Sequence, residues 1–411
     1  MSDRAGFAAL DPCVHCGFCL QACPTFVVTG DEADGPRGRI ELMRRLEQGD
    51  LSVHDPALRT HLERCLGCRG CEPVCPAGVG YGHGLEAARA RIAEAHPPRM
   101  VARLALRLLT SADAAPTAFA FGRALRATGI PGLLAGWGRT RFALGMLAAT
   151  QPDRGRRARP ALGAAPRSDR PTAWLFRGCV MEGLFAHVHD ATTRTLTVNA
   201  YDVREASGQV CCGALHAHAG LIEEARALAR RNLVAFRRDG FVVVNSAGCG
   251  AQLRDYGHLL PDNPDAAAFS ARVRDISELL AEGGGPVPGA PLPYRVAYDA
   301  ACHLHHAQRV TDPPFAVLRA IPGLDWRETP DSTQCCGSAG LFTLVQPELS
   351  QAVLRAKLEK LADDPPDVLA TGNPGCLMQL GAGARAAGLH TVARHPVELL
   401  DESYAGAGHY A

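Results

Sequence analysis

The chain has 411 residues, and its 43 lysines and arginines nearly balance its 42 aspartates and glutamates, for a formal net charge of +1. This length allows two or three domains, and the near-neutral charge gives no reason to expect nucleic acid or a strongly charged surface as a partner. The first residues, MSDRAGFAAL, lack the apolar run of a secretory signal, so we expect a cytoplasmic protein with reduced thiols.

Two cysteine runs with the spacing C-x2-C-x2-C-x3-C-P occupy residues 13–24 and 65–76. A reducing compartment disfavours disulfides. A simple zinc site takes four ligands from two short cysteine loops, and these two runs supply more cysteines than such a site needs. The repeated pattern is typical of two [4Fe-4S] clusters, in which the fourth cysteine of each run ligates the other run's cluster. We therefore assign one cluster to Cys13, Cys16, Cys19 and Cys75, and the other to Cys65, Cys68, Cys71 and Cys23.

The insert between the two runs has a helical pattern. Ile40, Met43 and Leu46 recur on one face, and Asp55 before a proline predicts the N-cap of a second helix. We therefore expect residues 1–95 to form an all-helical ferredoxin-type domain. The insert also carries a group of basic residues, which we expect to lie on a solvated helix face. The alternatives are that they raise the potential of a cluster or bind a partner. These residues are Arg37, Arg39, Arg44 and Arg45.

Residues 96–171 form the next segment, whose first part is rich in alanine, leucine and arginine. This part predicts short amphipathic helices broken at Pro116 and Pro131. Its apolar stretches fall short of the roughly 20 residues that a membrane-spanning helix needs, so we expect it to pack on a neighbour, or alternatively to touch a membrane surface. Residues 151–171 offer almost no large apolar side chain and predict an exposed linker at a domain boundary.

The remaining eight cysteines form two matching sets, each containing a Cys-Cys-Gly triplet, which predicts a duplicated module. Strand-like runs precede the first and last cysteine of each set, and helical segments follow the triplets. We therefore expect α/β modules with parallel sheets at residues 172–290 and 291–411, whose cysteines gather at the carboxyl ends of the strands. The two sets are Cys179, Cys211, Cys212 and Cys249, and Cys302, Cys335, Cys336 and Cys376.

The sequence also lacks a motif for hydride chemistry. No G-x-G-x-x-G turn follows a predicted strand, so we expect no flavin in this chain. We expect His303, His305 and His306 to be structural or partner-facing, with metal binding or assistance to a quinone as the alternatives, and we assign no catalytic residue to the chain. The alternative is a metal-free Cys-Cys pair acting as a redox-active thiol site, which would make the chain an enzyme itself.

The double cluster motif, the stretch DGPRGRI at residues 34–40, the linker and the paired Cys-Cys-Gly (CCG) modules together resemble the iron-sulfur subunit of bacterial glycolate oxidase over nearly the whole chain. Iron-sulfur proteins of anaerobic glycerol-3-phosphate dehydrogenase and of lactate-oxidising systems have a similar architecture, and the modules resemble the CCG-containing component of heterodisulfide reductase. The stretches SAGCGAQLRDYG at residues 246–257 and CCGSAG at 335–340 favour the glycolate branch.

The resemblance implies an electron-transfer subunit. FAD-binding partner subunits would oxidise glycolate to glyoxylate, and this chain would pass the electrons to a quinone or other membrane acceptor, either in the cytoplasm or peripherally on the cytoplasmic face of the inner membrane. The alternatives are the equivalent subunit of a D-lactate or glycerol-3-phosphate dehydrogenase, and a heterodisulfide-reductase-like thiol/disulfide enzyme.

The sequence departs from heterodisulfide reductase at one position of each module. That family has five cysteines per module, ending in C-x2-C, and holds a non-cubane iron-sulfur cluster. Here Ser246 and Asn373 replace the first cysteine of the pair, so four thiols remain in each module. These sets therefore predict either an additional iron-sulfur cluster or a module that has lost its cluster.

Overall fold

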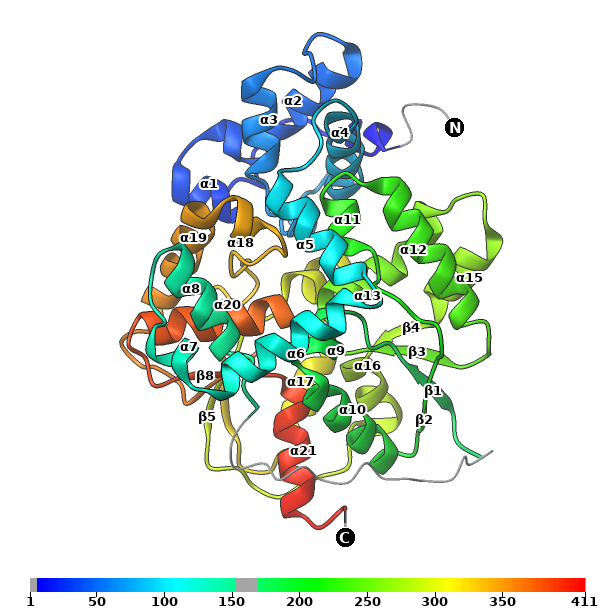
Figure 1. Ribbon diagram of the computed structural model, residues 1–411, viewed down its shortest axis with the longest axis vertical. Helices are drawn as coiled ribbons and strands as arrows, with labels where there is room; N and C mark the ends of the chain where they lie inside the picture. Colours follow the sequence, from blue (N-terminus) through cyan, green and yellow to red (C-terminus); the bar gives the residue numbers. More distant parts are fainter. Residues whose placement is uncertain (1–5, 153–168, 411) are drawn as a thin grey trace.

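The computed structural model describes residues 6–152 and 169–410. A helical N-terminal domain lies at one end of the molecule, two α/β modules form the other end, and a group of helices lies across one face (Figure 1). This arrangement confirms the predicted fold class: a helical ferredoxin-type domain followed by a duplicated α/β unit.

The N-terminal domain is all helical, as predicted. The carboxylate of Asp55 accepts hydrogen bonds from the N–H groups of Ala57 and Leu58, which confirms the expected N-cap. Met43 and Leu58 are fully buried in the core of this domain. Its α-helices are α1 (Pro24–Thr29), α2 (Pro36–Gln48), α3 (Pro56–Glu63) and α4 (Tyr81–Ala95), and its 3-10 turns are η1 (Phe7–Leu10) and η2 (Glu32–Asp34).

Four helices connect the N-terminal domain to the modules. Pro116 and Pro131 lie in the first turns of two of them, where a missing N–H is tolerated, which agrees with the predicted breaks. The predicted linker falls mostly on residues 153–168, outside the described residues. No helix in the described part of the chain is both long and apolar enough to cross a membrane. The four helices are α5 (Met100–Thr110), α6 (Ala114–Ala127), α7 (Ile130–Leu133) and α8 (Arg139–Ala148).

The first module contains a four-stranded sheet in the order β2-β1-β3-β4, with every neighbouring pair parallel. Its strands are β1 (Thr172–Leu175), β2 (Asp202–Glu205), β3 (Phe241–Val244) and β4 (Val273–Asp275). Its helices are α9 (Val180–Leu184), α10 (Ala186–Val198), α11 (Ala214–His218), α12 (Ile222–Ala235), α13 (Ala247–Arg254), α14 (Tyr256–Leu259), α15 (Pro264–Arg272) and α16 (Ile276–Ala281), followed by η3 (Glu282–Gly284).

The second module repeats this topology, with parallel strands in the order β6-β5-β7-β8. Its strands are β5 (Arg295–Tyr298), β6 (Asp325–Glu328), β7 (Val368–Ala370) and β8 (Val392–Arg394). Its helices are the π-helical turn η4 (His303–Ala307), α17 (Pro313–Arg319), α18 (Phe342–Val345), α19 (Pro347–Glu359), α20 (Pro374–Ala386) and α21 (Pro396–Gly406). The predicted duplication and parallel sheets are therefore confirmed.

The two modules pack against each other with approximate two-fold symmetry. Helix α10 contacts α21, and the corresponding pair α16 and α17 also pack together. At the first contact, the buried Arg194 donates a hydrogen bond of 2.7 Å to Asp401. Near the centre, the N–H of Ala247 donates to the carbonyl of Gly372, so the starts of α13 and α20 meet. Each of these helices carries the last cysteine of its module's set.

Candidate iron-sulfur centres

The first candidate centre lies in the loop that follows η1. One cavity is lined by all four cysteines assigned to the first cluster, three of them held in the loop before α1. Cys16 is exposed, whereas the other three are partly buried, so this centre is close to the surface. The guanidinium of Arg44 donates to the carbonyls of Leu10 and Cys13 and thereby fixes the start of the loop. The four cysteines are Cys13, Cys16, Cys19 and Cys75.

The second candidate centre lies deeper in the same domain. A neighbouring cavity is lined by the cysteines assigned to the second cluster: Cys23, Cys65, Cys68 and Cys71. The N–H of Gly67 and the hydroxyl of Tyr81 each lie 3.4 Å from the sulfur of Cys65. Donors of this kind stabilise the charge on cluster sulfurs and influence the reduction potential. Cys71 lines both cavities, so the two candidate centres are adjacent.

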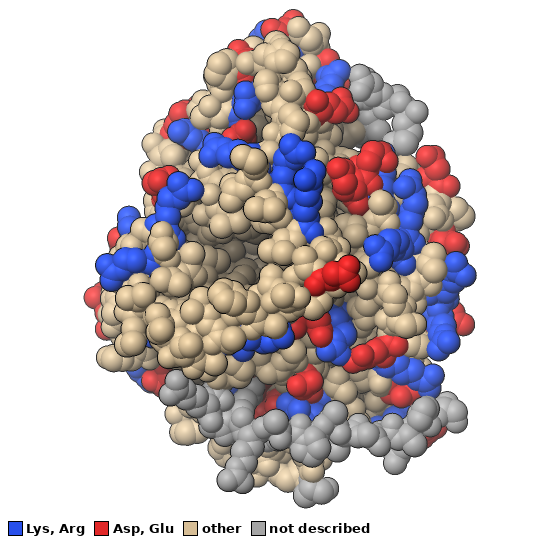
Figure 2. Space-filling view, in the orientation of Figure 1, with Lys and Arg blue, Asp and Glu red and all other residues tan. Residues whose placement is uncertain are grey.

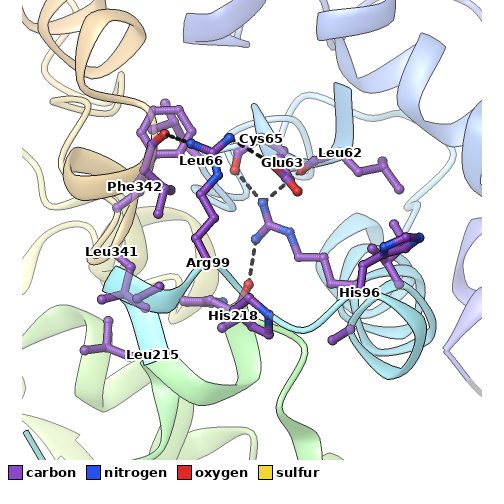
Figure 3. A pocket seen from close by; sticks show the side chains of 18 residues that line it. Leu62, Glu63, Cys65, Leu66, His96, Arg99, Leu215, His218, Leu341 and Phe342 are labelled. Atoms are coloured by element: carbon purple, nitrogen blue, oxygen red, sulfur yellow. Dashed lines mark hydrogen bonds and ion pairs between the residues drawn. The ribbon is translucent and has the colours of Figure 1, made fainter. Parts of the chain in front are cut away.

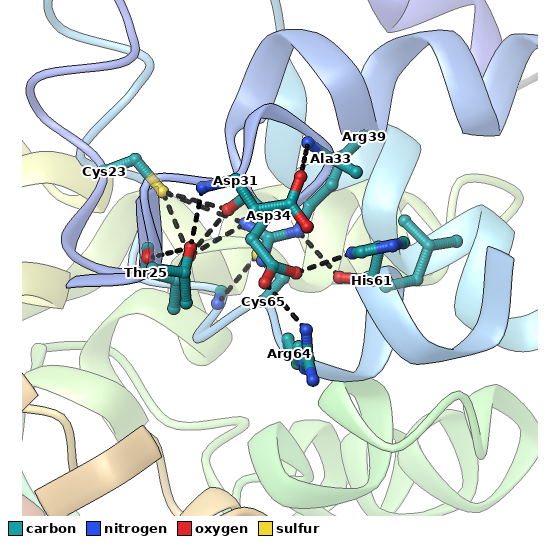
Figure 4. A network of polar contacts seen from close by, with 12 residues as sticks. Cys23, Thr25, Asp31, Ala33, Asp34, Arg39, His61, Arg64 and Cys65 are labelled. Carbon is teal, nitrogen blue, oxygen red and sulfur yellow. Dashed lines mark hydrogen bonds and ion pairs between the residues drawn. The ribbon is translucent and has the colours of Figure 1, made fainter. Parts of the chain in front are cut away.

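A buried arginine lies directly beside the second centre. Arg39 is only 1 % exposed, and its guanidinium lies 3.8 Å from the sulfur of Cys23 and 3.1 Å from the hydroxyl of Thr25 (Figure 4). Burial lowers the pKa of Arg39, but nearby thiols, Tyr81 and Asp34 outweigh this effect and raise it overall. Our expectation of a solvated helix face is therefore wrong for Arg39, because the loop before α1 packs over it.

The buried carboxylate of Asp34 completes this network. It accepts a hydrogen bond of 2.9 Å from Arg64, lies 2.8 Å from the ring nitrogen of His61, and is 3.6 Å from Arg39 (Figure 4). Asp31, Asp34 and His61 also have metal-like spacing, with ligand atoms within 4.8 Å of one another. Because the oxygens of Asp34 are already paired with cationic groups, this cluster is an ion-pair network that holds Arg39 in place.

The spacing of the sulfurs bears on whether a zinc site is already formed in this structure. All 16 cysteines are free thiols. Among the described residues, no three cysteine sulfurs lie within 4.8 Å of one another. Four thiolates on one zinc ion would be only about 3.8 Å apart, given zinc–sulfur bonds of about 2.3 Å. No set of three or four described sulfurs therefore has the spacing of a preformed zinc site, although the pair Cys179–Cys211 and the pair Cys302–Cys335 are 3.6 and 4.0 Å apart.

The second module gathers its four cysteines at the carboxyl ends of β5, β6 and β7, and all four are buried. The sulfurs of Cys302 and Cys335 are 4.0 Å apart, and the N–H of Gly337 lies 3.5 Å from the sulfur of Cys335. The side-chain amide of Asn373 donates to the sulfur of Cys376. The residue that replaces the fifth cysteine therefore contributes a hydrogen bond to a remaining sulfur.

A buried ion pair supports the second Cys-Cys pair. The ammonium group of Lys357 donates to the carbonyl of Gln334 and lies 2.6 Å from the carboxylate of Asp299. Burial lowers the pKa of Lys357, but Asp299 and the neighbouring thiols raise it overall, so the cation is retained. In the first module, the neutral Asn232 on the corresponding helix donates to the carbonyl of Cys211. The second module therefore has a buried ion pair next to its Cys-Cys pair, where the first module has a neutral amide.

The first module arranges its set in the same way but exposes more of it. The sulfurs of Cys179 and Cys211 are 3.6 Å apart, and Cys212 is buried behind them. Cys179 and Cys249 are only partly buried. Each set therefore brings its four cysteines to one edge of its sheet, as we expected from the positions of the strands.

One contact joins the N-terminal domain to the second module. Cys68 packs in one cluster with Cys302, Cys335 and Phe342. A hydrogen bond from Cys335 lowers the pKa of Cys68, against the opposing effect of burial. The second candidate centre is therefore in contact with the cysteine set of the second module. No sequence pattern indicates this contact, because it depends on how the domains dock.

The three histidines after Cys302 lie beside this contact. His306 is buried, and its ring nitrogen lies 2.7 Å from the carbonyl of Thr333, in the loop that leads to the second Cys-Cys pair. His303 lies 3.8 Å from the sulfur of Cys302. The expected structural role agrees with the position of His306, and the absence of a catalytic role stays a prediction.

Comparisons with known proteins agree with this architecture. Residues 9–79 match the family described as a 4Fe-4S dicluster domain, and residues 173–254 and 296–381 each match the family described as a cysteine-rich domain. The chain is 34 % identical to the probable glycolate oxidase iron-sulfur subunit of Bacillus subtilis, over 99 % of this chain and 96 % of that protein. It is 30 % identical to the glycolate oxidase iron-sulfur subunit of Escherichia coli, over 96 % and 94 %.

A more distant relative also aligns with nearly the whole chain. A component of the fumarate reductase (CoM/CoB) of Methanothermobacter marburgensis is 26 % identical over 95 % of this chain and 72 % of that protein.

Proposed function

The chain belongs to the family of glycolate oxidase iron-sulfur subunits, and we propose that it carries electrons from FAD-binding partner subunits, which oxidise glycolate to glyoxylate, to a quinone acceptor. The observation that carries this proposal is the continuous series of cysteine sites. Cys71 borders both N-terminal cavities, and Cys68 contacts Cys335 of the second module. Adjacent sites of this kind suit the transfer of single electrons along one chain.

The proposed cofactors are two [4Fe-4S] clusters in the N-terminal domain and an additional iron-sulfur cluster in the modules. Iron-sulfur clusters accept and release one electron at a time, which is the chemistry they supply here. The first cluster is held by Cys13, Cys16, Cys19 and Cys75, and the second by Cys65, Cys68, Cys71 and Cys23. The candidate ligands in the modules are Cys179, Cys211, Cys212 and Cys249, and Cys302, Cys335, Cys336 and Cys376.

The surrounding residues affect how the cysteines would bind a cluster. Burial and the nearby thiols raise the pKa of Cys19 to about 11, against the opposing effect of a backbone hydrogen bond, so this thiol must release its proton as it binds iron. Arg39 and Lys357 place positive charge beside the second N-terminal site and the second module. Oxidation of the substrate itself takes place on the partner subunits in this proposal.

We also propose a peripheral position on the cytoplasmic face of a membrane. Large apolar side chains of the connecting helices point outward, with Leu133 and Phe121 exposed by 83 % and 71 %. Residues 99–148 contain seven arginines and one acidic residue, Asp113. Figure 2 shows few charged side chains over α6 and α7. An apolar surface with an excess of arginine suits the interface of a bilayer that contains anionic lipid.

The function is tested on the complex purified with its partner subunits. We expect glycolate to drive the reduction of both ferricyanide and a quinone analogue, and removal of this chain to abolish quinone reduction. Parallel assays with D-lactate and glycerol-3-phosphate identify the substrate. Equal quinone reduction by the partner subunits alone would contradict the proposal, and disulfide reduction by the isolated chain would favour a thiol enzyme.

Iron content tests the proposed cofactors. Two [4Fe-4S] clusters hold eight irons, so we expect the anaerobically purified chain to hold more than eight, and Cys336→Ala to remove the excess. Because the fourth ligands are crossed, Cys23→Ser is expected to disturb the EPR signal of the cluster bound by Cys65, Cys68 and Cys71. Loss of the other cluster's signal instead would show that each run binds its own cluster.

A further inference from the structure

An apolar cavity lies where the N-terminal domain, α5 and both modules meet. It has a volume of about 140 Å³ and is lined by parts of α4, α5, α11 and α18 (Figure 3). Cys65, a proposed ligand of the second cluster, forms part of its wall. Most of the remaining wall is apolar and includes Leu62, Leu66, Ile92, Leu215 and Phe342.

The cavity has an entrance at the protein surface. Arg99, at the start of α5, donates to the carbonyl of Val345 and pairs with Glu63 across the cavity wall (Figure 3). The side chain of Arg99 is 58 % exposed, so this pair lies at the mouth. The helix that carries Arg99 belongs to the apolar surface that we propose to face the membrane. A ligand dissolved in the bilayer would therefore reach the cavity without crossing the protein.

A histidine lies on the cavity wall. The side chain of His218 lines the cavity, and burial lowers its pKa to about 3, so the imidazole is neutral at physiological pH. Arg89 donates to the carbonyls of His218 and Cys65, at 3.1 and 2.6 Å, and so fixes the backbone of both residues relative to each other (Figure 3). A neutral imidazole offers one donor and one acceptor, which allows it to bind a carbonyl and to pass on a proton.

A carboxyl group connects this histidine to solvent. The carboxylate of Glu86 lies 3.8 Å from the Nδ1 atom of His218. Glu86 also lines a second cavity, of about 560 Å³, which it shares with Glu223 on α12. The side chain of Glu223 is 73 % exposed, so water reaches this second cavity. Glu86 and His218 therefore form a polar link between a wet cavity and the apolar one.

The environment of Glu86 suits proton transfer. Burial raises its pKa to about 7, so the carboxyl is near half protonation at neutral pH. The charged and titratable groups around it are Asp255, which raises the pKa further, and His83, Arg69 and Arg89, which lower it.

We propose that the apolar cavity binds the ring of a quinone, with electrons arriving at Cys65 and protons arriving through Glu86 and His218. This inference rests on the proposed function, which supplies the electrons from oxidation of the 2-hydroxy acid. Two single-electron transfers and two protons convert the quinone to its quinol, and the protons come from water in the second cavity. No further reactant is required.

The size and lining of the cavity favour a quinone over a protein acceptor. An apolar cavity of about 150 Å³ is known to accommodate a benzene ring, and the volume here is similar. An electron-carrier protein takes electrons across an exposed surface and needs no proton path. The combination of an apolar cavity, a proposed cluster ligand and a proton link therefore points to an acceptor that takes up both electrons and protons.

The first test measures binding. We expect decylubiquinone to bind the oxidised complex in calorimetry, and Ala102→Phe on the cavity wall to weaken binding at least tenfold. Ala105→Phe makes the same change on the same helix outside the cavity wall and is expected to leave binding unchanged. If Ala102→Phe fails to fold, Ala219→Leu fills the same cavity from the residue that follows α11. Wild-type affinity in a folded cavity-filling variant, or no binding to the wild type, would overturn the inference.

The second test measures the proton path. As the pH rises through about 7, deprotonation of Glu86 is expected to slow decylubiquinone reduction by the wild-type complex. In Glu86→Gln, we expect at least a tenfold lower rate and no such step in the pH profile. An unchanged profile would overturn the assigned path.

A control separates this inference from the proposed function. Ferricyanide takes electrons without protons, so its glycolate-dependent reduction reports electron delivery alone. If ferricyanide is not reduced, the proposed function fails whatever the binding data show. If it is reduced but the cavity variants bind quinone normally, only the quinone site fails.

Discussion

At the residue scale, Arg39 shows how a single buried charge can adjust a redox centre. Its guanidinium lies 3.8 Å from the sulfur of Cys23, and Asp34 offsets part of its charge. We expect Arg39→Gln to lower the reduction potential of the second cluster by about 60 mV, which corresponds to an interaction of about 1.4 kcal/mol per electron. EPR-monitored redox titration of the purified chain measures this shift.

A matched control is available on the same helix. Arg45 is exposed and pairs with Glu41 and Asp50 at the surface. Arg45→Gln is therefore expected to leave both potentials unchanged, because solvent screens its charge. Equal shifts in the two variants would show that the effect of Arg39 is not due to its position beside Cys23.

The sequence predicts the chemistry of the cysteines better than that of their neighbours. The spacing of the thiols is itself a pattern, so the cysteine sets are visible without a structure. Arg39 and Lys357 carry no such pattern, because helical periodicity does not indicate which basic residue lies beneath a distant loop. Their burial follows from tertiary packing, which brings Cys23 over α2 and the second Cys-Cys pair over α19.

At the scale of elements, the start of α21 depends on an unprotonated histidine. The Nδ1 atom of His395 accepts a hydrogen bond from the N–H of Val397, and Glu398 completes the capping box. Burial lowers the pKa of His395 from about 6.5 to about 4. The stabilisation is therefore complete above about pH 6.5 and is lost as the pH falls toward 4, because the unfolded chain binds the proton more tightly.

We expect this histidine to make a measurable contribution to stability. As the pH falls from 7 to 5, protonation of His395 in the unfolded chain is expected to lower the free energy of unfolding by about 2 kcal/mol. Asparagine is a good N-cap that does not titrate, so His395→Asn is expected to lose that part of the pH dependence. Urea unfolding of both proteins at each pH measures the difference, and identical pH profiles would contradict the assignment.

The elements were predictable to different degrees. The strands that enter the first and last cysteines of each module are apolar runs, and the structure places β1, β3, β5 and β7 there. The edge strands β2 and β6 have the sequences DVRE and DWRE, and neither has an apolar pattern: β2 is mostly partly buried and β6 is mostly exposed. Charged residues suit a sheet edge because they discourage pairing with another chain, and they also hide the strand from sequence analysis.

At the scale of the whole molecule, binding of the connecting helices' apolar surface to a lipid bilayer can be tested. We expect the purified complex to sediment with vesicles that contain about one third anionic lipid, and to dissociate at high salt. The double change Phe121→Ser and Leu133→Ser removes two exposed apolar side chains and is expected to reduce binding at least tenfold.

An exposed apolar residue elsewhere provides the control. Val234 on α12 is also exposed, and Val234→Ser is expected to leave vesicle binding unchanged. If the double variant binds vesicles normally but no longer retains the partner subunits, the connecting helices form the subunit interface and the membrane assignment is wrong.

The arrangement of the domains could not be predicted from the sequence. The spacing of the motifs predicts three cysteine-bearing units, but not which units touch. Cys68, Cys302 and Cys335 belong to motifs whose local role already explains them, so nothing marks them as contact residues. The docking depends on shape complementarity among α-helices, which composition and periodicity do not describe.

The contact at Cys68 has an evolutionary consequence for the duplicated half. Two copies of a gene segment begin with the same constraints, but here one copy supplies the sulfurs that touch Cys68. A change near Cys335 then affects two domains at once, whereas a change near Cys211 affects mainly its own module. The second copy is therefore expected to diverge more slowly among related chains, and the first copy is free to acquire a different role.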